Sequence, residues 1–142
     1  MIRAIAPVLI ASALSLPLSA QISVGGLPYS MRIGMSDAQV PTVQPPAFDA
    51  ASVAVEDKAR ADAGSLPMYG RILPLSISPS THGVWTDLVN GDRFWRVRIT
   101  SPGALATELF FEGFRLPSGG IMHVRNEDGS EVMGGYTAAN NK

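Results

Sequence analysis

The sequence has 142 residues, with 11 basic and 12 acidic side chains, a net charge of −1 and no cysteine. This near-neutral balance excludes the concentrated basic surface that nucleic-acid binding requires. Disulfides are excluded too, so stability has to come from burial of apolar side chains, and a chain of this length buries one modest core.

Residues 1–20, MIRAIAPVLIASALSLPLSA, are typical of a secretory signal peptide. Arg3 precedes an apolar run that Pro7 and Pro17 interrupt, and the run ends in small residues. It is too short and too broken for a spanning helix of about 20 apolar residues. We therefore expect cleavage after Ala20, a secreted or periplasmic protein, and no stable membrane insertion once the signal is removed. A buried N-terminal helix is the weaker alternative, because Pro17 would end it without a cap.

Residues 21–47 are predicted to form an extended leader. Glycine and proline recur along this segment, and no helix or strand period is sustained. The leader also carries apolar side chains, so we expect it to lie against a partner that the sequence does not identify; these side chains are Val24, Leu27, Tyr29, Met31 and Ile33.

Residues 48–66 are predicted to form a short surface helix and a linker. Asp49 is the expected N-cap before a first turn at residues 50–52, and Phe48 with Val53 occupies the two positions of a hydrophobic staple. Gly64 is the expected stop. Glu56 and Arg60 have the spacing of a favourable i,i+4 ion pair.

Residues 67–142 are predicted to form an all-β domain, an antiparallel β-sandwich or jelly-roll-like fold. Period-two alternation and turn residues mark six strands, at residues 71–77, 83–89, 92–100, 104–114, 120–127 and 130–136. Four turn signals separate them. Asn90-Gly91 and Asp128-Gly129 favour type I′ hairpins, residues 101–104 a type II turn, and residues 116–119 a type I turn.

Alternation sorts the central strands into two faces. The expected core face carries Trp95, Val97, Ile99 and, after the turn, Leu105, Leu109 and Phe111. Each such side chain contributes about 1.5–3 kcal/mol when it is fully buried. The opposite face carries Phe94, Arg96 and Arg98. Its arginines are interpreted first as solvated or ion-paired strand residues, with Glu108 as a cross-strand partner, and the alternative is a partner-binding face.

No catalytic, cofactor-binding or metal-binding residue is predicted. His82 and His123 have no second metal ligand at a recognised spacing. The PSGG segment at residues 117–120 lacks the Gly-Asp of a serine protease nucleophile loop and is interpreted as a turn. The acidic NEDGSE segment at residues 126–131 lacks the twelve-residue frame of a calcium loop.

Three motifs carry a family resemblance: Trp-Arg-x-Arg-Ile at residues 95–99, Ser-Pro-Gly-Ala at 101–104 and Leu-Pro-x-Gly at 116–119. With GGLPYS at residues 25–30 and the segment at 46–70, they make nearly all of the mature chain resemble the N-terminal, non-catalytic region of secreted bacterial lysyl-endopeptidase-like proteins. The catalytic part of such proteins is a trypsin-like serine protease domain.

The resemblance implies a role without chemistry of its own. In such proteins the sandwich continues and the protease follows with its His, Asp and Ser, whereas this sequence stops at Lys142. We therefore expect a truncated sandwich that is the pro or accessory domain of an exported endopeptidase, and its partner is a downstream protease domain of the same or a related polypeptide. A stand-alone secreted module that binds a glycan or surface protein is the alternative, with Phe94, Tyr69 and Tyr136 as candidate contacts. A self-contained enzyme is disfavoured.

Overall fold

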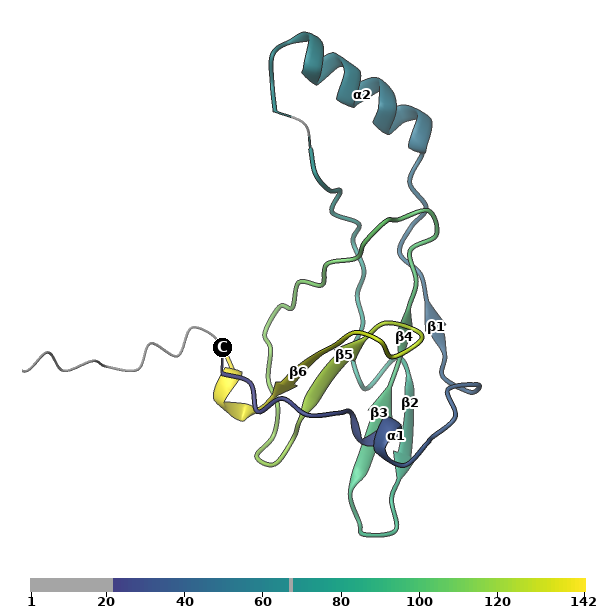
Figure 1. The fold of residues 1–142 in the computed structure, drawn as a ribbon, viewed down its shortest axis with the longest axis vertical. Helices are drawn as coiled ribbons and strands as arrows, with labels where there is room; N and C mark the ends of the chain where they lie inside the picture. The colour runs from purple at the N-terminus through teal and green to yellow at the C-terminus, as the bar shows by residue number, and fades with distance from the viewer. Residues whose placement is uncertain (1–21, 67) are drawn as a thin grey trace, which may run out of the picture. The chain divides into compact units, whose positions relative to one another are not determined.

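A computed structural model describes residues 22–66 and 68–142, so the predicted signal peptide lies outside the described residues (Figure 1). The elements in chain order are α1 (Tyr29–Arg32), β1 (Thr42–Val43), α2 (Ala50–Asp62), β2 (Val84–Asp87), β3 (Arg93–Arg96), β4 (Arg98–Ile99), β5 (Met122–Arg125), β6 (Val132–Tyr136) and the 3-10 helix η1 (Ala138–Asn140). They belong to two units. One comprises the described residues up to 32 together with residues 112–142, and the other comprises residues 33–111.

The strands pair as three separate two-stranded sheets. β2–β3 and β5–β6 are antiparallel, whereas β1–β4 is parallel. At the level of class the prediction is confirmed, because the described chain is β-rich with little helix. No helix among the described residues is long and apolar enough to cross a membrane.

Two of the six predicted strands do not form, although residues 71–77 and 104–114 lie wholly within the described part of the chain. Pro74 has no N–H to donate to a neighbouring strand, which works against the first of them. The second is rich in apolar residues, but such a pattern becomes a strand only when a partner takes up its backbone hydrogen bonds. No backbone hydrogen bond joins residues 105–110 to another described residue.

The predicted strand at residues 92–100 is divided in two. β3 pairs with β2, and β4 pairs with β1, which comes from the leader. The N–H of Arg98 donates to the carbonyl of Pro41 at 2.9 Å, and the N–H of Thr100 donates to that of Val43 at 3.1 Å. The strand changes partner at Val97 because these leader carbonyls are available to it, and part of the leader therefore lies along β4.

Both predicted type I′ hairpins are wrong in turn type. In the β2–β3 turn the N–H of Gly91 donates to the carbonyl of Leu88 at 3.0 Å. Gly91 has a φ of 88°, whereas the φ of Asn90 is not positive, although a type I′ turn would require it to be. The same arrangement recurs with Gly129, whose φ is 74°, and Asp128. A slightly longer loop needs positive φ at one glycine only, which avoids the cost of about 1–2 kcal/mol for a left-handed non-glycine residue.

The two proline turns have different outcomes. The type II turn at residues 101–104 is confirmed, because Ala104 N–H donates to Ser101 at 3.1 Å and Gly103 has a φ of 82°. The type I turn at residues 116–119 is wrong. The turn lies one residue later, at 117–120, since the side chain of Asn141 binds both backbone groups of Leu116, at 2.7 and 2.9 Å.

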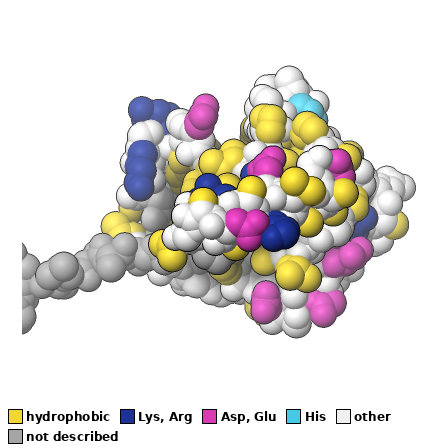
Figure 2. Space-filling view, turned by 90° about the horizontal axis from the view of Figure 1, so that it is seen from above, with side chains coloured by type: hydrophobic (Ala, Val, Ile, Leu, Met, Phe, Trp, Pro, Cys, Tyr) yellow, Lys and Arg dark blue, Asp and Glu magenta, His cyan; other side chains and the backbone are white. Residues whose placement is uncertain are grey.

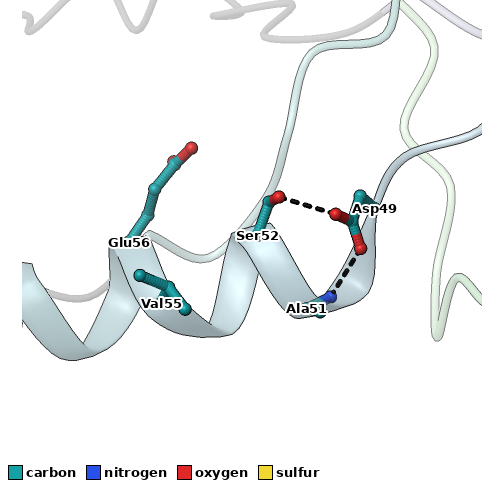
Figure 3. Close-up of a pocket in the computed structure, with 5 residues that line it drawn as sticks. All are labelled: Asp49, Ala51, Ser52, Val55 and Glu56. Carbon is teal, nitrogen blue, oxygen red and sulfur yellow. Dashed lines mark hydrogen bonds between the residues drawn. The ribbon is translucent and has the colours of Figure 1, made fainter.

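Helix α2 begins and ends where the sequence predicts, and Figure 3 shows its first turns. The Asp49 carboxylate accepts from Ala51 N–H at 2.9 Å and from the Ser52 hydroxyl at 2.6 Å. At the other end, Gly64 has a φ of 69°, and the N–H groups of Gly64 and Ser65 bond back into the last turn as in a Schellman motif.

One predicted ion pair of α2 is replaced by another. Glu56 binds Arg71 at 2.6 Å rather than Arg60, whose guanidinium donates to the carbonyl of Leu66. The i,i+4 pair that does form is Lys58–Asp62, at 2.9 Å. The difference arises because Arg71, distant in sequence, reaches the helix and competes for Glu56.

Replacing Asp49 with Ala is expected to reduce the helical circular-dichroism signal of α2. The Ser52 hydroxyl, and after it the backbone N–H of Ala51, hold the pKa of Asp49 below its ordinary value. A lowered folded-state pKa stabilises the helix above the unfolded pKa, and this contribution is lost as the pH falls through the folded pKa, below about pH 4. Asp49→Asn should keep much of the helix and lose this pH dependence. Asp62→Ala, the same charge change at the other end, is the control, and an equal loss in both alanine variants would contradict capping.

The predicted core is not present. No large apolar side chain among the described residues is buried. Trp95, Val97 and Ile99 are only half-buried, while Leu105 and Phe111 are exposed. Figure 2 shows apolar side chains at the surface between charged ones. The core prediction fails because a two-stranded sheet covers neither of its faces.

Candidate functional site

The predicted partner face is only partly assembled. Phe94 and Arg96 lie on the same face of β3, opposite Thr86 and Val84 of β2. The guanidinium of Arg96 lies over the Phe94 ring, 5.7 Å from its centroid. Arg98 lies in β4, opposite Thr42 of the leader strand β1. The structure therefore brings two of the three residues together and assigns the third to another sheet.

Arg96 is engaged within its own unit. It donates to Asp37 Oδ1 at 3.0 Å and to the Ser36 carbonyl at 2.8 Å, and its side chain is only 14% exposed. The prediction that Glu108 is the cross-strand partner of Arg96 is therefore wrong, because the segment that carries Glu108 does not pair as a strand. Arg96 ties the leader to the β2–β3 hairpin, and this role accounts for its charge without an external partner.

Arg96→Ala is expected to loosen the leader, whereas Arg98→Ala is not. Losing a hydrogen-bonded charged group of this kind costs about 1–3 kcal/mol. Hydrogen exchange at the N–H of residue 98, which binds the Pro41 carbonyl, should therefore become about tenfold faster or more in Arg96→Ala. Arg98→Ala keeps this N–H and is the matched control. Unchanged exchange in Arg96→Ala would show that the Asp37 contact does not hold the leader.

The opposite face of the hairpin carries a tryptophan pair, of which the sequence analysis assigned Trp95 to the core. Trp85 and Trp95 are directly opposite each other, and next to them lie Asp87 and Arg93, also opposite each other. We name these four residues the tryptophan face. Trp85 is 44% exposed. A two-residue loop at Asn90-Gly91 would place Trp85 opposite Arg96, so the pairing of the two tryptophans follows from the longer loop and the turn signal alone does not predict it.

The polar atoms of both indoles are satisfied by one segment, residues 78–83. The N–H of Trp85 donates to the Pro79 carbonyl at 2.8 Å, and that of Trp95 donates to the His82 carbonyl at 2.7 Å. Gly83 permits this close approach. Its φ is 79°, and a Cβ at this position would lie 2.5 Å from both Arg96 O and Trp95 Nε1. The indoles are therefore held in place with their N–H groups occupied.

Arg93 gives the tryptophan face a polar edge. Its guanidinium lies 4.7 Å from the centroid of the Trp85 ring and donates to Asp87 Oδ1 at 2.8 Å. Such an exposed cation–π contact contributes about 0.5–1 kcal/mol. A half-exposed indole beside a hydrogen-bonding pair is suited to stacking and hydrogen bonding with a ligand. It offers no nucleophile and no general acid–base pair.

The remaining features offer little chemistry. Within the described residues no three His, Asp or Glu side chains gather as a metal site. A shallow depression of about 430 Å³ lies at the first turns of α2, where the Asp49 carboxylate is already occupied by the helix cap (Figure 3). His82 contacts the hydroxyl of Thr81 at 2.8 Å, and His123 lies 3.4 Å from the Gly25 carbonyl.

The tryptophan face is thus the better-built of the two hairpin faces for contact with a ligand, and Phe94 with Arg96 serves mainly to hold the leader. Any function assigned to the chain has to rest on these surfaces and on its sequence motifs. No protein-family model matches the chain, and no solved structure matches it.

Proposed function

We propose that this chain is a non-catalytic pro or accessory β-domain of an exported serine endopeptidase, and that it supports folding, latency or targeting of a protease domain outside these 142 residues. The observation that carries the proposal is the absence of any buried large apolar side chain among the described residues. Exposed apolar surface of this extent is typical of a chain that another polypeptide covers.

The proposal includes the sandwich or jelly-roll architecture. Each sheet of the described chain has two strands, so every strand is an edge strand, and edge strands accept further pairing. Residues 105–110, which have no backbone hydrogen bond to another described residue, are the natural place for such pairing. Strands of the partner polypeptide would supply the missing cover.

The motifs of the family resemblance support the same proposal through their structural roles. Trp95 and Arg96 hold the hairpin and the leader, and the Ser-Pro-Gly-Ala segment forms a tight turn. Thr137 and Asn140, which belong to the same resemblance near the end of the sequence, form the capping box of η1. Secretion belongs to the proposal as well and rests on the predicted signal peptide.

The coding DNA beyond codon 142 tests the proposal directly. We expect a protease-coding frame with its own His, Asp and Ser, in the same or an adjacent gene. The protease domain, refolded with and without residues 21–142 added in trans, should then differ in active yield or in latency. A stop codon with no protease frame nearby, or identical yield and activity in the two refolding mixtures, would count against a pro or accessory role.

A glycan-binding module is a second candidate, and the tryptophan face favours it. An exposed indole beside a hydrogen-bonding ion pair is a common surface for sugar rings. The aromatic residues proposed from sequence do not form such a row: Tyr69 is 96% exposed in an irregular segment, Tyr136 is half-buried in β6, and Phe94 lies under Arg96. A glycan array probed with soluble protein decides this, with Trp85→Ala as the control. If no glycan on the array is bound, the hypothesis of a glycan-binding module is wrong.

A further inference from the structure

The N-terminal residues 22–25, here called the strap, lie along β6 and η1 (Figure 1). The Val24 N–H donates to the Gly135 carbonyl at 3.0 Å, and the Ser23 hydroxyl donates to the Gly134 carbonyl. The Asn140 side-chain amide donates to the Ile22 carbonyl at 2.8 Å. All of these residues belong to one unit. We name Gly134, Gly135 and Asn140 the cradle.

The cradle is shaped for a polypeptide backbone. Gly135 is buried, and a Cβ at this position would lie 2.5 Å from the nitrogen and 2.7 Å from the oxygen of Gly25. Two glycines inside a strand weaken it, and they mark either a bulge or the close approach of another backbone. Gly134 lies at the register shift of the β5–β6 pair, whereas Gly135 lies against Gly25. Here that backbone is the strap, so Gly135 leaves the space in which Gly25 lies.

Asn140, the third member of the cradle, is oriented by the capping box of η1. Asn140 Oδ1 accepts from the Thr137 N–H at 2.9 Å, within the capping box of η1, and this bond directs the amide nitrogen toward the Ile22 carbonyl. The strap is organised as well, because the Gly25 N–H donates to the Ser23 hydroxyl at 3.1 Å.

Recognition of the strap depends on backbone groups, one hydroxyl and one glycine. Its apolar side chains point largely to solvent, with Ile22 45% and Val24 64% exposed. Binding in which main-chain hydrogen bonds supply the affinity and one or two positions supply selectivity is the pattern of strand addition to a sheet edge. The edge used here is that of β6.

We propose that the cradle is a binding site for an extended peptide with a hydroxyl residue followed two positions later by glycine, and that the strap fills it in cis as a built-in competitor. A tethered segment acts at an effective concentration in the millimolar range, so it excludes weaker peptides until it is released. The proposal rests on contacts within one unit and does not depend on the proposed protease partner.

Val24→Pro tests the proposal in the chain as purified after export. Proline removes the N–H that binds Gly135 and leaves the cradle unchanged, so the strap should be released. A fluorescent peptide with the sequence of residues 21–27, Gln-Ile-Ser-Val-Gly-Gly-Leu, should bind Val24→Pro about tenfold or more tighter than it binds the unaltered chain, as measured by anisotropy. Similar affinity for both chains, or no binding to Val24→Pro, would overturn the proposal.

Three controls sharpen this test. Ile22→Pro keeps the carbonyl that Asn140 binds and removes an N–H without an acceptor among the described residues, so it should behave as the unaltered chain does. The peptide carrying Val24→Pro should not bind, and the peptide carrying Ser23→Ala should bind about fivefold more weakly. Equal binding of all three peptides would show that the contact is not specific.

A measurement on the unaltered chain covers the case in which Val24→Pro does not fold. Millimolar free peptide should displace the strap and accelerate hydrogen exchange at the Val24 N–H, while exchange in α2, which belongs to the other unit, should not change. No acceleration at several millimolar peptide would contradict the built-in competitor.

Discussion

The exported chain, residues 21–142, is expected to aggregate or to bind a hydrophobic dye when it is purified alone. Fully or largely exposed apolar side chains occur in several segments and include Leu66, Tyr69, Ile72, Val89, Leu105 and Phe110. Each large apolar side chain that remains exposed forgoes about 1.5–3 kcal/mol of burial, and a domain of this size is stable by only about 5–15 kcal/mol. A few such losses make the isolated chain marginal.

Dye fluorescence, size-exclusion chromatography and a thermal melt together check this expectation. Binding of the proposed protease partner should lower the dye signal, because the partner covers the apolar surface. If the chain alone instead melts cooperatively as a soluble monomer and binds no dye, then its apolar side chains do not need a partner, and the observation that carries the proposed function is lost.

Gly83→Ala is expected to disrupt the tryptophan face. Alanine at a φ of 79° is strained by about 1–2 kcal/mol. The added Cβ would also lie 2.5 Å from Arg96 O and Trp95 Nε1, and an overpacked site of this kind costs a further 1–3 kcal/mol, approximately. We expect loss of the near-UV circular-dichroism signal of Trp85 and Trp95 and a red shift of their fluorescence.

Substitutions at two other glycines distinguish backbone strain from the steric clash of the added Cβ. Gly91 also has a positive φ, of 88°, but a Cβ there meets nothing within 4 Å, so Gly91→Ala should show the backbone strain alone. Gly70 lies in open space without a positive φ, so Gly70→Ala should leave the spectra unchanged. If Gly83→Ala resembles Gly91→Ala, the close approach of residues 78–83 to the indoles does not position the tryptophans.

The sequence predicted the candidate surfaces only in part. Phe94 and Arg96 do share a face, as alternation predicts, but the acidic partner is Asp37 and not Glu108. The cradle left a visible signal in the Gly134-Gly135 pair, which a regular strand does not favour. Which backbone approaches these glycines is not specified by any local pattern, because Ser23 and Gly134 are 111 positions apart in the sequence.

The sequence by itself determined the features whose causes lie within a few residues. Asp49 and Gly64 bound α2, Ser101 to Ala104 form a turn with Gly103 in the left-handed region, and the alternating segments beside Asn90-Gly91 and Asp128-Gly129 become hairpins. Capping, glycine φ and short hairpin loops are local in energy, so the residues involved are neighbours in the chain.

Only the tertiary structure decided which strands exist and what covers them. Residues 104–114 have the pattern of a strand and form none, while β1, from a leader without strand periodicity, pairs with β4. A strand is completed by the hydrogen bonds of its neighbour, and apolar burial is completed by whatever lies on the face. Both depend on residues far away in the chain, so alternation predicted a core at Trp95 and Leu105 that the described fold does not bury.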